Sequence, residues 1–193
     1  MGGETFLCDP GRGLYDLYRR YGRAQNVFCN SYGHSQRRIG RRLQSSGREF
    51  GGKISLYDTN GPEKRVTMTI GGAYQVPGLA RVQRSLRLAA HGERAGDLIV
   101  KDVFTFSGAL QPIEEALVTW LSVEVSGATA VLTGETHKLQ LTPEHPRDAV
   151  FSLQVMKEES KANLKDGVLK RLSYEIGPKA ESIARIRATV LPL

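Results

Sequence analysis

Cysteine is scarce in this sequence, and long apolar runs are missing from it. Among 193 residues the cysteines are Cys8 and Cys29, which are too few for a disulfide framework. Because both lie in apolar stretches, we expect two reduced, buried thiols rather than a bridge. No apolar run approaches the roughly 20 residues of a membrane-spanning helix, and residues 1–20 lack the layout of a signal peptide. We therefore expect a soluble chain, and the sequence does not indicate its cellular compartment.

The motifs of several enzyme classes are also missing. The sequence contains no glycine-rich phosphate loop after a strand, no Gly-x-Ser-x-Gly turn and no Cys-x-x-Cys pair. His91, His137 and His145 show no metal-ligand spacing, so we interpret them as surface residues. Glu114 and Glu115 are too close in sequence to be trusted as an acid/base pair. The residues by themselves indicate nothing more specific than an anion-binding domain.

Positive charge is in excess and gathers early in the chain. Lysine and arginine total 27 against 20 aspartates and glutamates, which gives a formal net charge of +7. The planar fork of arginine suits carboxylate, sulfate and phosphate alike, so the bias favours an acidic polysaccharide or a nucleic acid as partner. A solvated arginine face without a ligand explains the same pattern. The early arginines are Arg12, Arg19, Arg20, Arg23, Arg37, Arg38, Arg41, Arg42 and Arg48.

From residue 53 onward, short segments of alternating character are separated by glycine, proline, asparagine and aspartate. In residues 65–70 the apolar Val66, Met68 and Ile70 share one face, as in a half-buried strand. Residues 53–58 precede this segment across a turn, which predicts a hairpin. Further strands are predicted at residues 82–89, 97–106, 116–125, 128–132, 137–141, 150–156, 168–176 and 182–191.

This succession of strands predicts an all-β fold. Helical turns are expected only at residues 72–79 and 14–22. Each one-sided apolar face needs a second sheet to cover it, so we predict a large antiparallel, supersandwich-like β-sandwich in one domain over residues 1–193. Turn residues mark the chain reversals at residues 92–96, 126–127, 143–146 and 165–167.

The N-terminal third holds the most suggestive side chains. Asp9 stands before a Pro-Gly break that would present its carboxylate at a sheet edge, although a turn-capping aspartate explains it as well. His34 is flanked by small residues that permit close approach of a metal ion or ligand, although a lone histidine is weak support for a site. Structural zinc takes four ligands and catalytic zinc three, so these two residues do not make a site.

An ordered series of motifs spans nearly the whole chain. It begins with Asp9-Pro-Gly leading to Tyr15, continues through the arginine-bearing, serine-rich residues 23–35 that contain His34, and reaches a Gln-Ser-Ser-Gly hairpin end at residues 44–47. In this order the series resembles the C-terminal β-sandwich domain of the heparinase II/III-like family of polysaccharide lyases. The later motifs of the series are Ala73-Tyr74, Arg84-Ser-Leu86 and Asp102-Val-Phe104.

The resemblance implies cleavage of acidic, uronate-containing polysaccharides by β-elimination. In that reaction a base removes the proton beside a neutralised carboxyl group, and the glycosidic oxygen leaves. The resemblance also implies that Asp9 and His34 bind zinc, as the corresponding residues do in metal-containing members. The third ligand of the family is a histidine just upstream of that aspartate, and residues 1–8 contain none, so the site is incomplete. We predict that Tyr15, Tyr32, Arg12, Arg37 and Arg38 bind the substrate, although the loop with Arg37 and Arg38 is more basic than the usual pattern of the family.

Most catalytic groups of the family come from an α/α toroid before the sandwich, and this sequence contains no toroid. We therefore expect a lyase domain that is nearly inactive alone, with an acidic polysaccharide and a separate or lost toroid as partners. A broad apolar surface and self-association are expected to follow. The alternative is a non-catalytic β-sandwich that binds acidic glycans or a partner chain through its arginine-rich N-terminal region. Nucleic-acid binding rests on charge alone, since no aromatic-basic recognition motif supports it.

Overall fold

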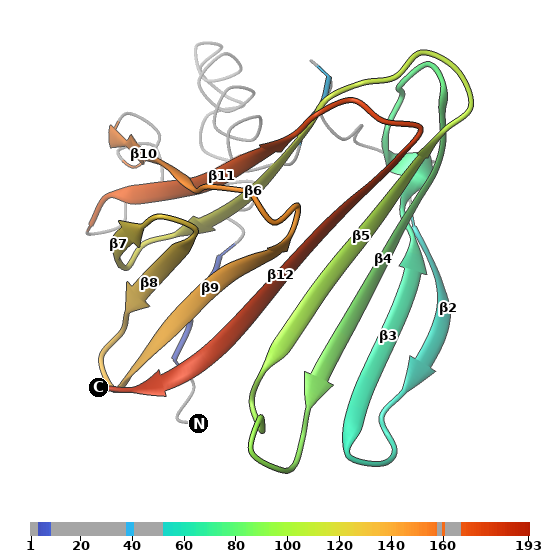
Figure 1. Cartoon of the computed structure of the whole chain (residues 1–193). Coiled ribbons are helices and arrows are strands. Elements are labelled where there is room, and N and C mark those ends of the chain that lie inside the picture. The colour runs from blue at the N-terminus through green and yellow to red at the C-terminus, as the bar shows by residue number, and fades with distance from the viewer. Residues whose placement is uncertain (1–3, 9–37, 41–51, 158–159, 161–166) are drawn as a thin grey trace, which may run out of the picture.

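Two antiparallel β-sheets make up the computed structural model of the chain (Figure 1). The predicted all-β sandwich is confirmed, and η2 (Gly71–Ala73) lies where the sequence predicts a helical turn. The helical turn predicted at residues 14–22 lies outside the described residues, and the single domain over residues 1–193 stays a prediction. The structure describes residues 4–8, 38–40, 52–157, 160 and 167–193.

The larger sheet has eight strands in the order β2-β3-β4-β5-β12-β9-β8-β7. Its last strand in sequence, β12, therefore lies in the middle of the sheet, where it forms ladder hydrogen bonds with β5 and β9. The strands are β2 (Lys53–Asp58), β3 (Glu63–Thr69), β4 (Leu79–Ala89), β5 (Leu98–Phe106), β7 (Ser122–Ser126), β8 (Thr129–Thr133), β9 (His137–His145) and β12 (Glu181–Pro192).

The smaller sheet has four strands in the order β1-β6-β11-β10. Figure 1 shows it beside the part of the large sheet that includes β7, β8, β9 and β12, while β2 and β3 extend away from it. Among the strands that the structure describes, the small sheet therefore does not extend over β2 and β3. Its strands are β1 (Arg38–Ile39), β6 (Ile113–Thr119), β10 (Ser152–Met156) and β11 (Leu169–Ile176).

The core lies between the sheets and follows from the alternation along each strand. In β12, Ala184, Ile186 and Ala188 are buried and the residues between them are half-buried, which is the period-two pattern of a strand with one covered face. Phe104 of the large sheet and Leu172 of the small sheet are fully buried in the same cluster. Burial of each such large side chain contributes roughly 1.5–3 kcal/mol. Among the described residues, β2 and β3 contribute no member to this cluster.

One predicted strand is wrong. Residues 116–125 are predicted as a single strand, but β6 ends at Thr119 and β7 begins at Ser122, and the two strands lie in different sheets. The Thr119 hydroxyl donates to the carbonyl of Phe6 at 2.6 Å and accepts from the backbone N–H of Leu121 at 3.1 Å. These bonds satisfy backbone groups at the corner, so the chain can leave one ladder and enter the other.

The end of β9 also differs from the prediction. Residues 143–146 are predicted as a turn, but β9 continues through Pro143 to His145. Pro143 lies opposite Ile186 of β12, whereas the pairing of β9 with β8 ends at Leu141. Proline has no N–H to donate, and a stretch of strand with one neighbour tolerates that loss.

A candidate anion-binding site

Arg38 is the one predicted site residue that lies within the described part of the chain. The assignments of the others to zinc or to substrate therefore stay predictions. The predicted site residues outside the described residues are Asp9, Arg12, Tyr15, Tyr32, His34 and Arg37.

The short strand β1 holds Arg38 beside β6. Ile39 pairs with Ile113 in the antiparallel ladder, and both side chains are fully buried. This apolar pair fixes the register, so the preceding residue, Arg38, pairs with Glu114 on the opposite face. On that face Arg38 Nε lies 3.7 Å from Glu114 Oε2. The position of the arginine thus follows from the burial of its neighbour.

Glu114 links Arg38 to a second arginine. Arg171 of β11 donates from Nη1 to Glu114 Oε1 at 2.8 Å, and its side chain is 5% exposed against 39% for Arg38. Burial alone would raise the pKa of Glu114. The hydrogen bond from Arg171 and the charges of both arginines outweigh that effect, so the pKa lies below its ordinary value of 4.5. The carboxylate is therefore ionised at neutral pH.

In the cluster of Arg38, Glu114 and Arg171, two guanidinium groups share one carboxylate, and Glu175 of β11 lies directly opposite Glu114 in the ladder. Nε and Nη2 of Arg171 are buried and have no hydrogen-bond partner within the described part of the chain, which is a costly arrangement for a charged donor. Arg38 is the arginine of the cluster that reaches solvent. A second carboxylate or a sulfate can pair with its terminal nitrogens without displacing Glu114 from Arg171.

The N-terminal segment also lies beside β6. The backbone N–H of Cys8 donates to the carbonyl of Val118 at 2.9 Å, and the thiol sulfur lies 3.6 Å from the same oxygen. The Cys8 side chain is half-buried, and the reduced state of the thiols stays a prediction. Cys29 lies outside the described residues. Cys8, which precedes Asp9 in sequence, and Arg38 thus both lie beside β6.

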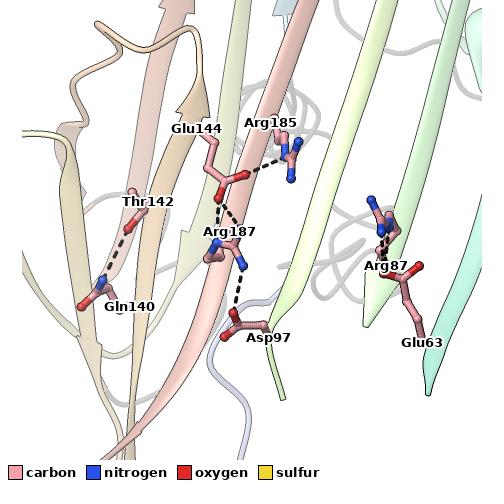
Figure 2. A network of polar contacts seen from close by, with 8 residues as sticks. All are labelled: Glu63, Arg87, Asp97, Gln140, Thr142, Glu144, Arg185 and Arg187. Atoms are coloured by element: carbon pink, nitrogen blue, oxygen red, sulfur yellow. Dashed lines mark hydrogen bonds and ion pairs between the residues drawn. The ribbon is translucent and has the colours of Figure 1, made fainter. Parts of the chain in front are cut away.

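The outer face of the large sheet carries a second polar cluster (Figure 2). Arg187 of β12 donates to Glu144 at 2.6 Å and to Asp97 at 2.9 Å, and Arg185 also pairs with Glu144. Burial tends to lower the pKa of Arg187, but its hydrogen bonds to Glu144 and Asp97 raise it above its ordinary value. Two arginines pair with two carboxylates here, so the charges of these four residues balance.

A third polar cluster lies on the same outer face, on β3 and β4. Arg87 and Arg65 both donate to Glu63, and the bond from Arg87 is the main reason that the pKa of Glu63 is lowered. Figure 2 shows the Arg87–Glu63 pair apart from the cluster around Arg187. The ladder registers place Arg65, Arg87 and Arg187 in one row across the sheet. Exposed ion pairs of this kind contribute little to stability and chiefly keep the face hydrated.

Sequence reasoning missed both outer-face clusters. The available signal was the placement of arginines at positions 185 and 187 of one strand, because alternate residues share a face. Their partners Glu144 and Asp97 are 43 and 90 residues from Arg187 in sequence. Only the strand order identifies those partners.

The prediction of surface histidines is confirmed for His91 and His145. His91 and His145 are exposed, and the His137 side chain is 37% exposed. Glu114 and Glu115 point to opposite faces of β6, as consecutive strand residues must, so they do not form an acid/base pair.

Metal ligands do not cluster within the described ranges of the chain. No group of three or more His, Cys, Asp and Glu side chains is placed there to hold a metal ion. The same ranges include no helix with the length and apolarity needed to span a membrane. The predicted zinc site at Asp9 and His34 remains a prediction.

Known proteins resemble this chain in fold. No family model and no curated protein matches the sequence. The heparan sulfate lyase HepC from Pedobacter heparinus is similar with a TM-score of 0.73 and 14% identity, over 97% of this chain and 29% of that one. A heparinase III, the BT4657 gene product, aligns with a TM-score of 0.68 and 12% identity, over 97% and 28% of the two chains. Another heparinase III structure aligns with a TM-score of 0.58 and 11% identity, over 82% and 23%.

These similarities define a heparinase-like fold. The TM-scores of 0.58 to 0.73 support a shared backbone arrangement. Sequence identities of 11% to 14% do not extend that similarity to shared chemistry. The chain spans less than a third of the length of each of these lyases. It thus has the fold of one part of a heparan sulfate lyase.

Proposed function

We propose that the chain is the β-sandwich domain of a polysaccharide lyase and binds an acidic, uronate-containing polysaccharide that is cleaved by β-elimination. The observation that carries the proposal is the heparinase-like fold, which matches the heparan sulfate lyase HepC over 97% of this chain. The net charge of +7 supports it, because a positive surface attracts a polymer of carboxylates and sulfates.

In this proposal Arg38 pairs with a carboxylate or sulfate of the polysaccharide, and Glu114 and Arg171 hold its guanidinium in position. β-Elimination depends on such charge quenching, because a neutralised uronate carboxyl group makes the adjacent C–H more acidic. The reaction also needs a side chain that exchanges protons. The proposal also assigns Tyr15 and Tyr32 to substrate binding. The remaining residues assigned to it are Arg12 and Arg37.

The proposal assigns Asp9 and His34 to a zinc site. Cys8 and Arg38 lie against β6 residues four positions apart, a span of roughly 13 Å. His34 precedes Arg38 by four residues, and four extended residues reach at most roughly 13–14 Å. Chain length therefore permits His34 to approach Asp9. Catalytic zinc takes three protein ligands, so a third must come from elsewhere, and the bound ion supplies Lewis acidity.

Binding of heparan sulfate by this chain tests the proposal. We expect binding at low ionic strength that weakens with added salt, and no comparable binding of a neutral glycan. Arg38→Gln should weaken the affinity by about tenfold, the effect of losing one charge-assisted contact. Arg94→Gln is the matched control, because Arg94 is an exposed arginine in the turn between β4 and β5. Equal binding of the neutral glycan, or equal loss in both variants, would count against the proposal.

A non-catalytic module that binds acidic glycans is the second candidate. It rests on the arginine-rich N-terminal region, which suits a carboxylate or sulfate polymer without any catalytic group. Genomic context separates the two candidates. A continuous reading frame that encodes a helical toroid before this sequence supports the lyase, and an independent complete gene supports the binding module.

A further inference from the structure

Strand β2 forms one end of the eight-stranded sheet (Figure 1), and its outer edge has no neighbour among the described residues. Residues 53–57 are all exposed, including Ile54 at 59%, Leu56 at 45% and Tyr57 at 70%. A free edge offers unpaired backbone N–H and C=O groups to another strand. Three large apolar side chains on such an edge mark a surface that is stabilised when it is covered.

A β-bulge in β2 determines which of its apolar side chains share a face. The register against β3 shifts between Ile54 and Leu56. As a result, Ile54 lies opposite Met68 and Tyr57 lies opposite Val66. Met68 and Val66 are two positions apart on a regular strand, so they share a face, and so do Ile54 and Tyr57.

The same bulge puts the two charged ends of β2 on the other face. Lys53 lies opposite Thr69 and Asp58 lies opposite Arg65, and these β3 residues are four positions apart. Without the bulge, Lys53 and Asp58 would lie on opposite faces, because they are five positions apart. With the bulge, β2 is complementary to a reversed copy of itself.

We propose that a second copy of this chain pairs its β2 antiparallel with this β2, about a twofold axis between Ser55 and Leu56. Lys53 of each copy then faces Asp58 of the other, and Ile54 of each faces Tyr57 of the other. The pairing forms two ion pairs on the face that also carries Leu56, and two apolar contacts between Ile54 and Tyr57 on the other face. It joins two eight-stranded sheets edge to edge.

The charges of β2 favour a second copy over an unrelated strand. Lysine on an edge normally blocks strand addition, because its ammonium loses water without gaining a partner. A reversed copy of β2 supplies Asp58 opposite Lys53 twice, and cross-strand pairs of opposite charge are stabilising. A register shifted by one residue would place the apolar side chains of one copy on the charged face of the other.

Sedimentation velocity of the full chain over a range of concentrations tests this pairing. We expect a monomer–dimer equilibrium. Lys53→Glu or Asp58→Lys alone places like charges opposite each other at two points of the dimer, and each should weaken association roughly tenfold. The double variant with both changes should restore it. Glu124→Lys on β7, the opposite end of the same sheet, is the matched control and should leave association unchanged.

Hydrogen exchange gives a second readout that needs no substitution. The amides of β2 should become protected as the concentration rises, while those of β7 should not. Because residues 53, 58 and 124 are at most half-buried, the variants should keep the far-ultraviolet circular dichroism of the parent chain. A chain that stays monomeric overturns the pairing. So does a dimer that neither single variant weakens, or a double variant that does not recover.

Discussion

At the scale of single residues, Glu114 determines how two arginines are presented. Its carboxylate accepts from Arg171, which is buried, and lies near Arg38, which reaches solvent. Loss of one partner from a fully buried ion pair costs roughly 3–5 kcal/mol, because a charge is left desolvated. Glu114 is itself 23% exposed, so solvent screens part of that effect.

Glu114→Gln should therefore lower the free energy of unfolding by about 1–2 kcal/mol at neutral pH. The pKa of Glu114 is lowered in the folded chain, so its contribution is present above 4.5 and is lost as the pH falls through the lowered pKa. The difference between the parent and the variant should shrink below pH 4.5. Urea unfolding of both proteins at a series of pH values measures this difference in the free energy of unfolding.

Glu124→Gln is the control for this titration, since Glu124 is an exposed carboxylate on β7. It should change the unfolding midpoint little at any pH. If the Glu114→Gln difference stayed constant down to strongly acidic pH, the two arginines would not be held by this carboxylate.

At the scale of elements, the turn into β4 depends on one glycine. Gly78 has a φ of +81°, and a Cβ there would lie 2.8 Å from the backbone nitrogen of Ala109. Gly78→Ala should lower the free energy of unfolding by about 2–3 kcal/mol, because it combines backbone strain with a contact that neither backbone segment can relieve. Chemical denaturation of the purified variant measures the loss.

Gly127 provides the matched comparison for Gly78. Its φ is +59°, and no heavy atom lies within 4 Å of a Cβ built there. Gly127→Ala should cost about 1 kcal/mol, from the left-handed backbone alone. Equal losses in the two variants would show that the close approach of Ala109 is unimportant.

Strands could be predicted from the sequence wherever alternation and turn residues agree. The predicted strand at residues 53–58 has the bounds of β2. The break between β6 and β7 could not be predicted in this way, because the apolar pattern continues through it. The break is stabilised by the bond from Thr119 to Phe6, which is 113 residues away in sequence.

At the scale of the whole molecule, sheet order decides what the candidate site contains. The basic N-terminal segment indicates Arg38 from sequence alone. Glu114 and Arg171 reach it only because β6 lies between β1 and β11. Strand order depends on long-range pairing, which local patterns do not encode, so the sandwich could be predicted but the partners of Arg38 could not.

Heparan sulfate mixed with this chain, observed for binding and for ultraviolet absorbance in one sample, tests the central claim most directly. β-Elimination leaves an unsaturated uronate that absorbs in the ultraviolet. Since the chain covers only 29% of HepC, we predict that it binds the polysaccharide while the absorbance stays constant. A steady rise in absorbance would contradict a domain that is inactive alone, and a failure to bind would contradict its place in a lyase of acidic polysaccharides.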